Sequence, residues 1–404
     1  MNPTFTNKFA RVLFIGHDAS RSGAPMVLLD FLGWLKKNSD LEFALLLRQG
    51  GPLVEDFKQL TRVCILDGEL LPRRGTIFHR ILKRCGLVPL LTRLRVFQTF
   101  PPSQFATIYS NTVTNSTIDI LYGNAGCTVI CHAHEMGSMI RYFGESEARS
   151  ASRVISKYIA ASNAVAADLG ARFHLPSSKI AVIEEFSSRV GLPKPEQLRL
   201  RRKVRESLGL ANSDFVVGMC GSLNRRKGAD LFLAISLEAR RRYPAENLRF
   251  IWIGSNPASA EQEQLVNDAV LAGDPDAILF LPSQSDPTPF YCALDVFALT
   301  SREDPYPLVM IEAASVDLPV VCFKSSGGTP DFVSTDAGIS VPYLNCTEFV
   351  NAIVQLSKQP DLRRRLGTVA GERATSEHSV ASQAPKLLKV LNSTLNREIP
   401  NISG

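Results

Sequence analysis

The sequence predicts an α/β protein made of two doubly wound parallel-sheet domains. The chain has 404 residues, enough for two or three domains of ordinary size. Short apolar runs rich in Val, Ile and Phe alternate with longer amphipathic stretches almost from end to end, which is the pattern of alternating strands and helices. Each half also opens with a strand that runs into a glycine-containing turn, RVLFIGHDASRSG in the first half and FVVGMCGSLNRRKG in the second.

The predicted strands are apolar on both faces, as strands of a parallel sheet covered by helices must be. In the first half they are 12–16, 43–47, 63–66, 107–110, 129–132, 158–161 and 180–183. In the second half they are 215–220, 248–253, 277–281, 296–299, 319–323 and 338–341.

A linker is predicted over 187–202, SSRVGLPKPEQLRLRR, which has two prolines, few large apolar residues and a run of charge. The expected domains are therefore 1–190 and 191–375. Two such α/β domains imply a cleft between them, where ligands preferentially bind.

Composition excludes global disorder, coiled coil and collagen, because hydrophobic residues make up 45% and charged residues 21% of the chain. The eight cysteines form no Cys-x-x-Cys pair, so we expect reduced thiols in a cytosolic protein. The apolar run before Gly16 is too short for a signal peptide, and no run is long enough to cross a bilayer. The net charge of +6 does not by itself select among nucleic acid, anionic substrate and anionic membrane.

Two familiar phosphate-binding signatures are absent. Neither glycine turn reads G-x-G-x-x-G, and no G-x-x-x-x-G-K-[ST] occurs, which argues against a nicotinamide enzyme or a Walker-type ATPase.

The most informative segment is SREDPYPLVMIE, residues 301–312. Pro307 suits the first turn of a helix that follows Asp304, and the first amide groups of that helix would be free to point at an anion. Glu312 is the one acid in an otherwise apolar helix. A buried carboxylate of this kind needs a hydroxyl or a cation as its partner.

Two further loops are expected at the same edge of the sheet. Residues 324–331, KSSGGTPD, place Gly327 and Gly328 ahead of a short helix. The turn after the first strand of the second half carries Arg225, Arg226 and Lys227. These cations either neutralise a diphosphate or form a solvated charged loop.

No metal site is predicted. The stretch CHAHEMG places His132, His134 and Glu135 at the end of a strand, but no third ligand stands at a recognisable spacing. Residues 274–276, Asp-Pro-Asp, are typical of a turn before a strand.

The second half resembles the second domain of family 4 retaining glycosyltransferases, which have the GT-B fold. The segments that carry the resemblance are GSLNRRKGADLFL, RFIWIG, AILFLPS, YCALDVFALTSREDPYPLVMIEAASVDLPVVCF and SSGGTPDFV. The first half is similar more loosely, through FIGHDASRSGAP, IYSNTVTN, CHAHE and YIAASNAV. The resemblance implies two Rossmann-like domains facing a central cleft, with a C-terminal helix in 376–404 packing back on the first domain.

Members of that family have an E-x7-E motif, which here reads Asp304-x7-Glu312. The resemblance implies that Glu312 holds the ribose hydroxyls of a nucleotide sugar. Asp304 and the amides of Tyr306, Leu308 and Val309 would face the donor sugar and phosphates.

Many members also carry G-R-x-x-x-x-K-G. Lys227 matches its lysine, but Ser222 stands at the arginine, so Arg226 or, as the less favoured candidate, Arg225 would supply the missing charge.

The resemblance extends to residues outside these motifs. Gly23 matches the family's glycine near the phosphate, and His134 matches the histidine that contacts the donor sugar, with His17 as a weaker candidate. We expect the base to contact backbone around Leu281 to Ser283.

The predicted activity is transfer of a sugar from a nucleotide-diphosphate sugar to an acceptor hydroxyl, with no metal or other cofactor and no nucleic-acid partner. Lys227, Arg226 and the helix N-termini would stabilise the departing diphosphate. Retention of anomeric configuration is implied by the resemblance alone. The alternatives are a GT-B nucleotide-sugar epimerase or phosphorylase, and a non-catalytic nucleotide-sugar-binding or scaffold subunit, which Ser222 keeps open.

The basic residues are concentrated in 72–100, which contains no acid and interleaves its cations with apolar residues. Those cations are Arg73, Arg74, Arg80, Lys83, Arg84, Arg93 and Arg95. Such a segment is typical of peripheral attachment to anionic lipid, or of an anionic lipid-linked acceptor, whereas the alternative is a solvated basic face. We therefore expect a cytoplasmic protein that contacts the inner face of the membrane.

Overall fold

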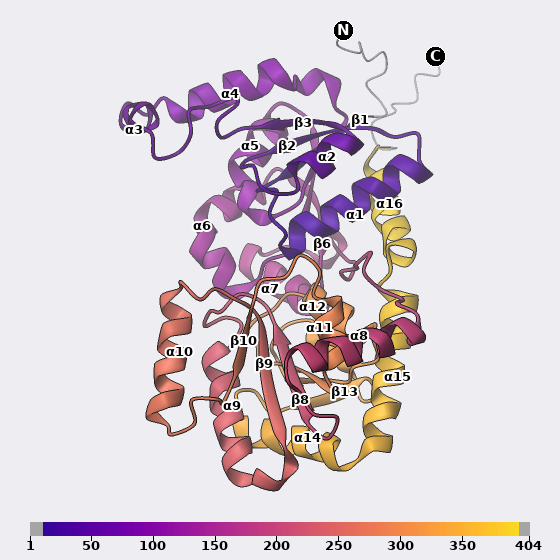
Figure 1. The fold of residues 1–404 in the computed structure, drawn as a ribbon. Helices are drawn as coiled ribbons and strands as arrows, with labels where there is room; N and C mark the ends of the chain where they lie inside the picture. The colour runs from indigo at the N-terminus through magenta and orange to yellow at the C-terminus, as the bar shows by residue number, and fades with distance from the viewer. Residues whose placement is uncertain (1–10, 396–404) are drawn as a thin grey trace. The chain divides into compact units, whose positions relative to one another are not determined.

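The computed structural model describes residues 11–395, which divide into two compact units (Figure 1). The first unit takes in the chain up to Glu184 and again from Val380, and the second is Glu185–Ser379. Each unit has one sheet, and the strand pairs of both sheets are parallel. The predicted α/β class with two Rossmann-like domains is confirmed.

The first unit has a 7-stranded sheet in the order β3-β2-β1-β4-β5-β6-β7. Its strands are β1 (Arg11–Gly16), β2 (Glu42–Leu47), β3 (Arg62–Ile65), β4 (Thr107–Ser110), β5 (Thr128–Ala133), β6 (Ile155–Ala160) and β7 (Ile180–Val182). Its helices are α1 (Gly23–Asn38), α2 (Val54–Leu60), α3 (Ile77–Arg84), α4 (Val88–Thr99), α5 (Ser116–Asn124), α6 (Gly137–Ala151), α7 (Asn163–Phe173) and α16 (Val380–Leu395). The inner strand β1 is buried along its whole length, as its sequence RVLFIG predicts.

The second unit has a 6-stranded sheet in the order β10-β9-β8-β11-β12-β13. Its strands are β8 (Phe215–Cys220), β9 (Leu248–Ser255), β10 (Leu279–Pro282), β11 (Val296–Leu299), β12 (Val320–Phe323) and β13 (Gly338–Val341). Its helices are α8 (Lys194–Ser207), α9 (Ala229–Arg242), α10 (Ala260–Leu271), α11 (Thr288–Ala293), α12 (Leu308–Ala314), α13 (Thr329–Val333), α14 (Cys346–Lys358) and α15 (Pro360–Glu377). Every strand predicted from the sequence is present, with ends that shift by a few residues at most.

The prediction of a linker over 187–202 is wrong from Lys194 onward, where α8 begins. A proline stands in its first turn, where no helical hydrogen bond is lost. Arg201 and Arg205 then form ion pairs of 2.7 and 2.6 Å with Asp295 of the same unit. These ion pairs give α8 a packed face, which the run of arginines in the sequence does not indicate.

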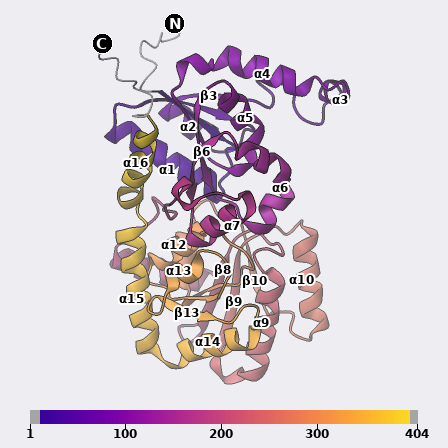
Figure 2. The same cartoon turned by 180° about the vertical axis from the view of Figure 1, so that it is seen from behind.

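The last described helix, α16, returns to the first unit and packs on α1, as both views show (Figures 1 and 2). Leu387 and Leu391 of α16 are fully buried there. The C-terminal helix was expected within 376–404, of which residues 396–404 lie outside the described residues. Over 11–395, no helix has both the length and the apolar character needed to cross a bilayer.

Candidate functional site

Three loops of the second unit meet at the carboxyl edge of its sheet. They follow β8, β11 and β12, which are neighbours in the strand order. The amide of Asp304 donates to the carbonyl of Ser326 over 2.7 Å, and the amide of Gly328 donates to the carbonyl of Asp304 over 3.2 Å. The amide of Arg302 donates to the carbonyl of Arg226 over 2.8 Å. Backbone hydrogen bonds therefore join the loop of Asp304 to both of its neighbours.

Asp304 is the centre of a charged cluster in these loops. Its Oδ2 lies 2.5 Å from Nζ of Lys227 and accepts a hydrogen bond of 3.2 Å from Ser301. Its Oδ1 lies 3.6 Å from the guanidinium of Arg226. Burial alone would raise the pKa of Asp304, but the charges of Lys227 and Arg226 outweigh burial and hold that pKa below its ordinary value. Asp304 is therefore ionised at neutral pH and fixes the position of Lys227.

Two glycines allow the loops to approach this closely. Gly228 has φ 72°, and a Cβ built on it would lie 2.0 Å from the carbonyl oxygen of Thr300. Gly327 has φ 119°, and its Cβ would lie 1.8 Å from the carbonyl oxygen of Asp304. Because no other residue fits such contacts at positive φ, glycine is required at both positions.

Arg225 and Arg226 occupy different environments. The guanidinium of Arg226 is half-buried and donates to the carbonyl of Glu303 over 2.8 Å. Arg225 is exposed, and its carbonyl accepts a hydrogen bond of 2.7 Å from Arg302. The structure thus brings Arg226, and not the side chain of Arg225, to Asp304. Ser222, at the position of the family's arginine, is exposed and accepts from the side chain of Asn224.

Glu312 is buried in α12, as predicted, and it has both kinds of expected partner. Its Oε1 accepts a hydrogen bond of 3.1 Å from Ser187 and lies 3.9 Å from the guanidinium of Arg189. Arg189 also donates from its amide to Ser187 over 3.1 Å and from its side chain to the carbonyl of Ser285 over 2.9 Å. Sequence reasoning missed Ser187 and Arg189, since both lie in the predicted linker far from Glu312 along the chain.

The helix after Asp304 begins one residue later than predicted. Pro307 has extended backbone at the N-cap of α12, so the prediction that it lies in the first helical turn is wrong. Leu308 and Val309 are the first two residues of α12 and are partly exposed. The first amides of a helix have no acceptor within it, so these two can donate to a ligand. Gly328 is the N-cap of the next short helix, α13.

Tyr306 is anchored by a histidine that sequence reasoning did not identify. Its hydroxyl lies 3.1 Å from Nε2 of His378, and Nδ1 of His378 lies 3.0 Å from the carbonyl oxygen of Glu185. Because a carbonyl can only accept, Nδ1 carries the proton that is donated to Glu185. In the neutral ring, Nε2 then accepts from Tyr306. No motif in the sequence connects positions so far apart.

The remaining predicted residues lie outside this cluster. Leu281 is buried in β10, and its carbonyl already accepts a hydrogen bond of 2.9 Å from Ser255. In the first unit, Gly23 is the first residue of α1, and His134 makes a hydrogen bond of 3.1 Å with Asn111. The contacts expected of these residues with a donor stay predictions.

The other residues of the CHAHE stretch have packing partners in the first unit. His132 is buried, its Nδ1 lies 2.8 Å from the hydroxyl of Tyr109, and burial lowers its pKa well below the ordinary value. Glu135 accepts hydrogen bonds from the hydroxyl of Thr112 and the amide of Val113. These two side chains therefore support the end of β5.

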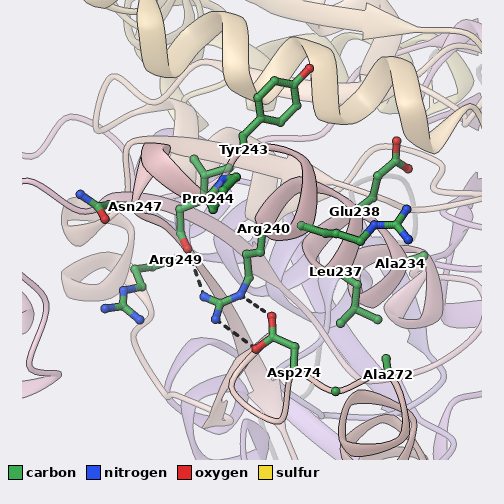
Figure 3. A pocket seen from close by; sticks show the side chains of 13 residues that line it. Ala234, Leu237, Glu238, Arg240, Tyr243, Pro244, Asn247, Arg249, Ala272 and Asp274 are labelled. Carbon is green, nitrogen blue, oxygen red and sulfur yellow. Dashed lines mark hydrogen bonds and ion pairs between the residues drawn. The ribbon is translucent and has the colours of Figure 1, made fainter.

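A cavity of about 800 Å³ lies at the other edge of the second sheet, around the start of β9 (Figure 3). Arg240 and Asp274 form an ion pair of 2.6 Å in its wall. In open parallel sheets, ligands bind beyond the carboxyl ends of the strands. Since the cavity lies at the amino-terminal end of β9, we place the candidate site at the charged cluster and not here.

Comparison with known proteins finds a family match in the second unit. Residues 214–359 match the family Glycosyl transferases group 1. Over 143 residues the chain is 30% identical to an uncharacterized glycosyltransferase of Haemophilus influenzae, a match that covers 35% of this chain and 39% of that protein. It is 29% identical to a D-inositol 3-phosphate glycosyltransferase of Saccharomonospora viridis, with 43% of this chain and 42% of that protein covered. The matches thus span about two-fifths of these curated relatives.

Similarity in structure covers almost the whole chain. The crystal structure of Anabaena HepE in complex with UDP and glucose is similar with a TM-score of 0.78 at 22% identity, over 95% of this chain and 99% of that one. Sucrose-phosphate synthase from Thermosynechococcus elongatus is similar with a TM-score of 0.69 at 16% identity, over 96% and 100%. At these identities the likeness concerns the fold. The chain therefore has the GT-B fold, and residues 214–359 of its second unit match the glycosyl transferases group 1 family.

Proposed function

We propose that this protein transfers a sugar from a nucleotide-diphosphate sugar to an acceptor hydroxyl. The observation that carries the proposal is the convergence of Lys227 and Arg226 on buried Asp304 at the carboxyl edge of the second sheet. The three residues lie within the segment that matches the glycosyltransferase family. Two fixed cations beside the first amides of α12 suit a diphosphate.

In the proposed reaction, the bond between the sugar C1 and the diphosphate oxygen breaks, and its electron pair stays on the diphosphate. That charge is stabilised by Lys227, Arg226 and the amides of Leu308 and Val309. The proposal gives this role to the chain and not to a metal. The acceptor oxygen bonds to C1, and its proton passes to the departing phosphate oxygen. Attack on the face that the diphosphate leaves gives retention, as the resemblance to family 4 implies.

In the same proposal, Glu312 binds the ribose hydroxyls of the donor. Ser187 and Arg189 fix its carboxylate before the nucleotide arrives. UDP is the first nucleotide to test, because the similar Anabaena protein was solved with UDP and with UDP-glucose. The proposed acceptor is a hydroxyl of a glycan or of a lipid-linked glycan.

Binding is tested first, by thermal shift of the full chain with UDP, GDP, ADP and their sugars. A ligand at 100 times its Kd stabilises the fold by about 2.7 kcal/mol, which is readily detected. We expect one nucleotide to raise the Tm of the wild type and of Arg241→Ala, an exposed control, but not of Glu312→Ala. Absence of a shift with every nucleotide would contradict the proposed donor site.

Turnover is tested with the nucleotide sugar that binds. Nucleoside diphosphate is expected to appear only when a sugar acceptor is present, and Lys227→Ala is expected to slow its release by about 10²–10³-fold. Release without acceptor would favour an epimerase or a hydrolytic side reaction. Binding without any release, in wild type and variants alike, would favour a non-catalytic scaffold.

A further inference from the structure

The helices α3 and α4 of the first unit expose large apolar side chains to solvent. Both figures show the pair at the outer side of that unit, with α3 at the far end of α4 (Figures 1 and 2). Phe78 is 60% exposed and Leu90 is 54% exposed. The full exposed set is Ile77, Phe78, Ile81, Leu87, Leu90 and Leu94. Exposed apolar patches of this kind mark interaction surfaces.

In α3, the apolar and basic residues lie on separate faces. Ile77 and Ile81 are four residues apart and so lie one above the other, and Phe78 lies beside them. Arg80 and Arg84 lie on the adjoining side, with Arg84 next to Ile77 around the helix axis. Of this apolar face, only Leu82 is buried. The core of the unit therefore buries little of this apolar face, and the rest of the face is exposed.

In α4, two arginines flank the exposed apolar residues. Leu90 and Leu94 share one face of the helix, while Thr92 and Val96 are buried on the opposite side. Arg93 and Arg95 lie on either side of Leu94 in the sequence, about 100° away from it around the helix axis. Helix α4 therefore also combines exposed apolar side chains with cations.

The charges of this segment are all of one sign. No Asp or Glu occurs between Glu69 and Asp119. The seven cations of 72–100 are exposed, and none of them forms an ion pair with any residue in the described range 11–395. Exposed apolar side chains among unpaired cations do not stabilise a protein surface that contacts water alone. An anionic lipid surface suits both, since its headgroups attract the cations and its acyl boundary accepts the apolar side chains.

We propose that α3 and α4 dock this protein on an anionic lipid bilayer, with Ile77, Phe78, Ile81, Leu90 and Leu94 inserted at the headgroup boundary. The inference does not depend on sugar transfer, because it is tested by lipid binding alone. Its electrostatic part weakens with salt, since the Debye length falls from about 8 Å at physiological ionic strength to about 3 Å at 1 M.

The test is flotation of the full chain with phosphatidylcholine vesicles that contain or lack phosphatidylglycerol. Wild type is expected to float only with the anionic vesicles. Neutralising Arg80, Lys83 and Arg84 to Gln is expected to weaken binding by about 100-fold, from the attraction of three cations near the surface. The matched control neutralises the exposed Arg202, Lys203 and Arg241 of the second unit and is expected to float like wild type.

Insertion is tested separately from attraction. The triple change of Ile77, Phe78 and Ile81 to Ser keeps every cation and is also expected to abolish flotation, whereas the same change at the exposed Val266, Val270 and Leu271 of α10 is not. Cys85, at the end of α3, is the exposed thiol among the described residues. A polarity-sensitive dye on Cys85 is expected to shift to the blue with anionic vesicles only.

Three results would overturn the proposal. The first is flotation of both test variants with wild-type affinity. The second is loss of binding in the charge variant alone together with equal affinity for DNA, which would indicate a general polyanion site. The third is a concentration-dependent dimer that only the apolar variant disrupts, which would indicate that a second copy covers this surface. Circular dichroism of each variant checks that it is folded.

Discussion

At the scale of single residues, the candidate site depends on one buried ion pair. Asp304 and Lys227 are each largely buried, and their closest atoms lie 2.5 Å apart. Removing one partner of a buried pair leaves an uncompensated charge, which typically costs about 3–5 kcal/mol. Arg226, 3.6 Å from the other carboxylate oxygen, offsets part of that cost. Asp304 therefore stabilises the fold as well as the geometry of the cations.

Lys227→Ala is expected to reduce the free energy of unfolding at pH 7 by about 3 kcal/mol, the lower end of that range. The folded-state pKa of Asp304 lies below the ordinary value of 3.8, so its stabilising contribution is present above pH 3.8 and is lost as the pH falls through the folded pKa. Urea unfolding at several pH values should therefore show the two proteins converging in acid. Arg225→Ala, an exposed control, should match wild type throughout. A constant difference at every pH would contradict this account.

Ser187 is expected to act as a positioning residue for Glu312. Ser187→Ala removes one hydrogen bond of 3.1 Å to the carboxylate, which is worth about 1 kcal/mol and hence about a fivefold loss of nucleotide affinity. Ser187→Thr keeps the hydroxyl and should restore binding. In turnover, KM for the donor should rise with kcat nearly unchanged. A fall in kcat at constant KM would show that Ser187 acts elsewhere.

At the scale of elements, the strands were predictable and the contacts among loops were not. Strands such as Phe215–Cys220 are apolar on both faces, and this local pattern gives their positions directly. The meeting of Lys227 with Asp304 requires the strand order β8-β11-β12, which the sequence pattern does not contain. Helix α8 was not predicted, because the sequence alone suggests that Arg201 and Arg205 are solvated. Only the structure shows that both form ion pairs with Asp295.

The same reasoning explains which residues of the candidate site could be predicted. Glu312 was predictable because a lone acid in an apolar helix has a high cost of burial. Its partners Ser187 and Arg189, and His378 beside Tyr306, have no distinguishing local pattern and depend on long-range folding. Glycine, by contrast, marked the crowded turns from the sequence alone.

Gly327→Ala is expected to disrupt the joined loops. The added Cβ would meet the carbonyl oxygen of Asp304, and the residue would keep an unfavourable positive φ, so we expect a loss of about 1–3 kcal/mol in unfolding free energy. Gly273→Ala is the matched control, with φ 81° and no atom within 4 Å of its added Cβ. Chemical denaturation measures both, and equal losses would mean that φ alone, and not the contact with Asp304, sets the cost.

At the scale of the whole molecule, the chain has one tryptophan in each unit, Trp34 in α1 and Trp252 in β9. Leu387→Ala in α16 removes a fully buried side chain from the first unit, at a cost of about 2–5 kcal/mol. With Trp252→Phe as background, the fluorescence of Trp34 should show a lower urea midpoint. With Trp34→Phe as background, the midpoint reported by Trp252 should stay unchanged.

The control for this experiment is Leu356→Ala, which removes a fully buried side chain of α14 in the second unit. It should lower the midpoint of Trp252 and leave that of Trp34 unchanged. If either variant moves both midpoints together, the two units unfold as one cooperative body.

The return of α16 to the first unit also fixes the order in which the protein can be completed during synthesis. The second unit is one continuous stretch, Glu185–Ser379, and all of it has been translated before α16 emerges from the ribosome. The first unit, although its strands are made earliest, lacks the helix that covers α1 until residues 380–395 are added. A chain truncated just before Val380 therefore contains the whole second unit and a first unit whose α1 lacks its covering helix, a surface to which chaperones can bind.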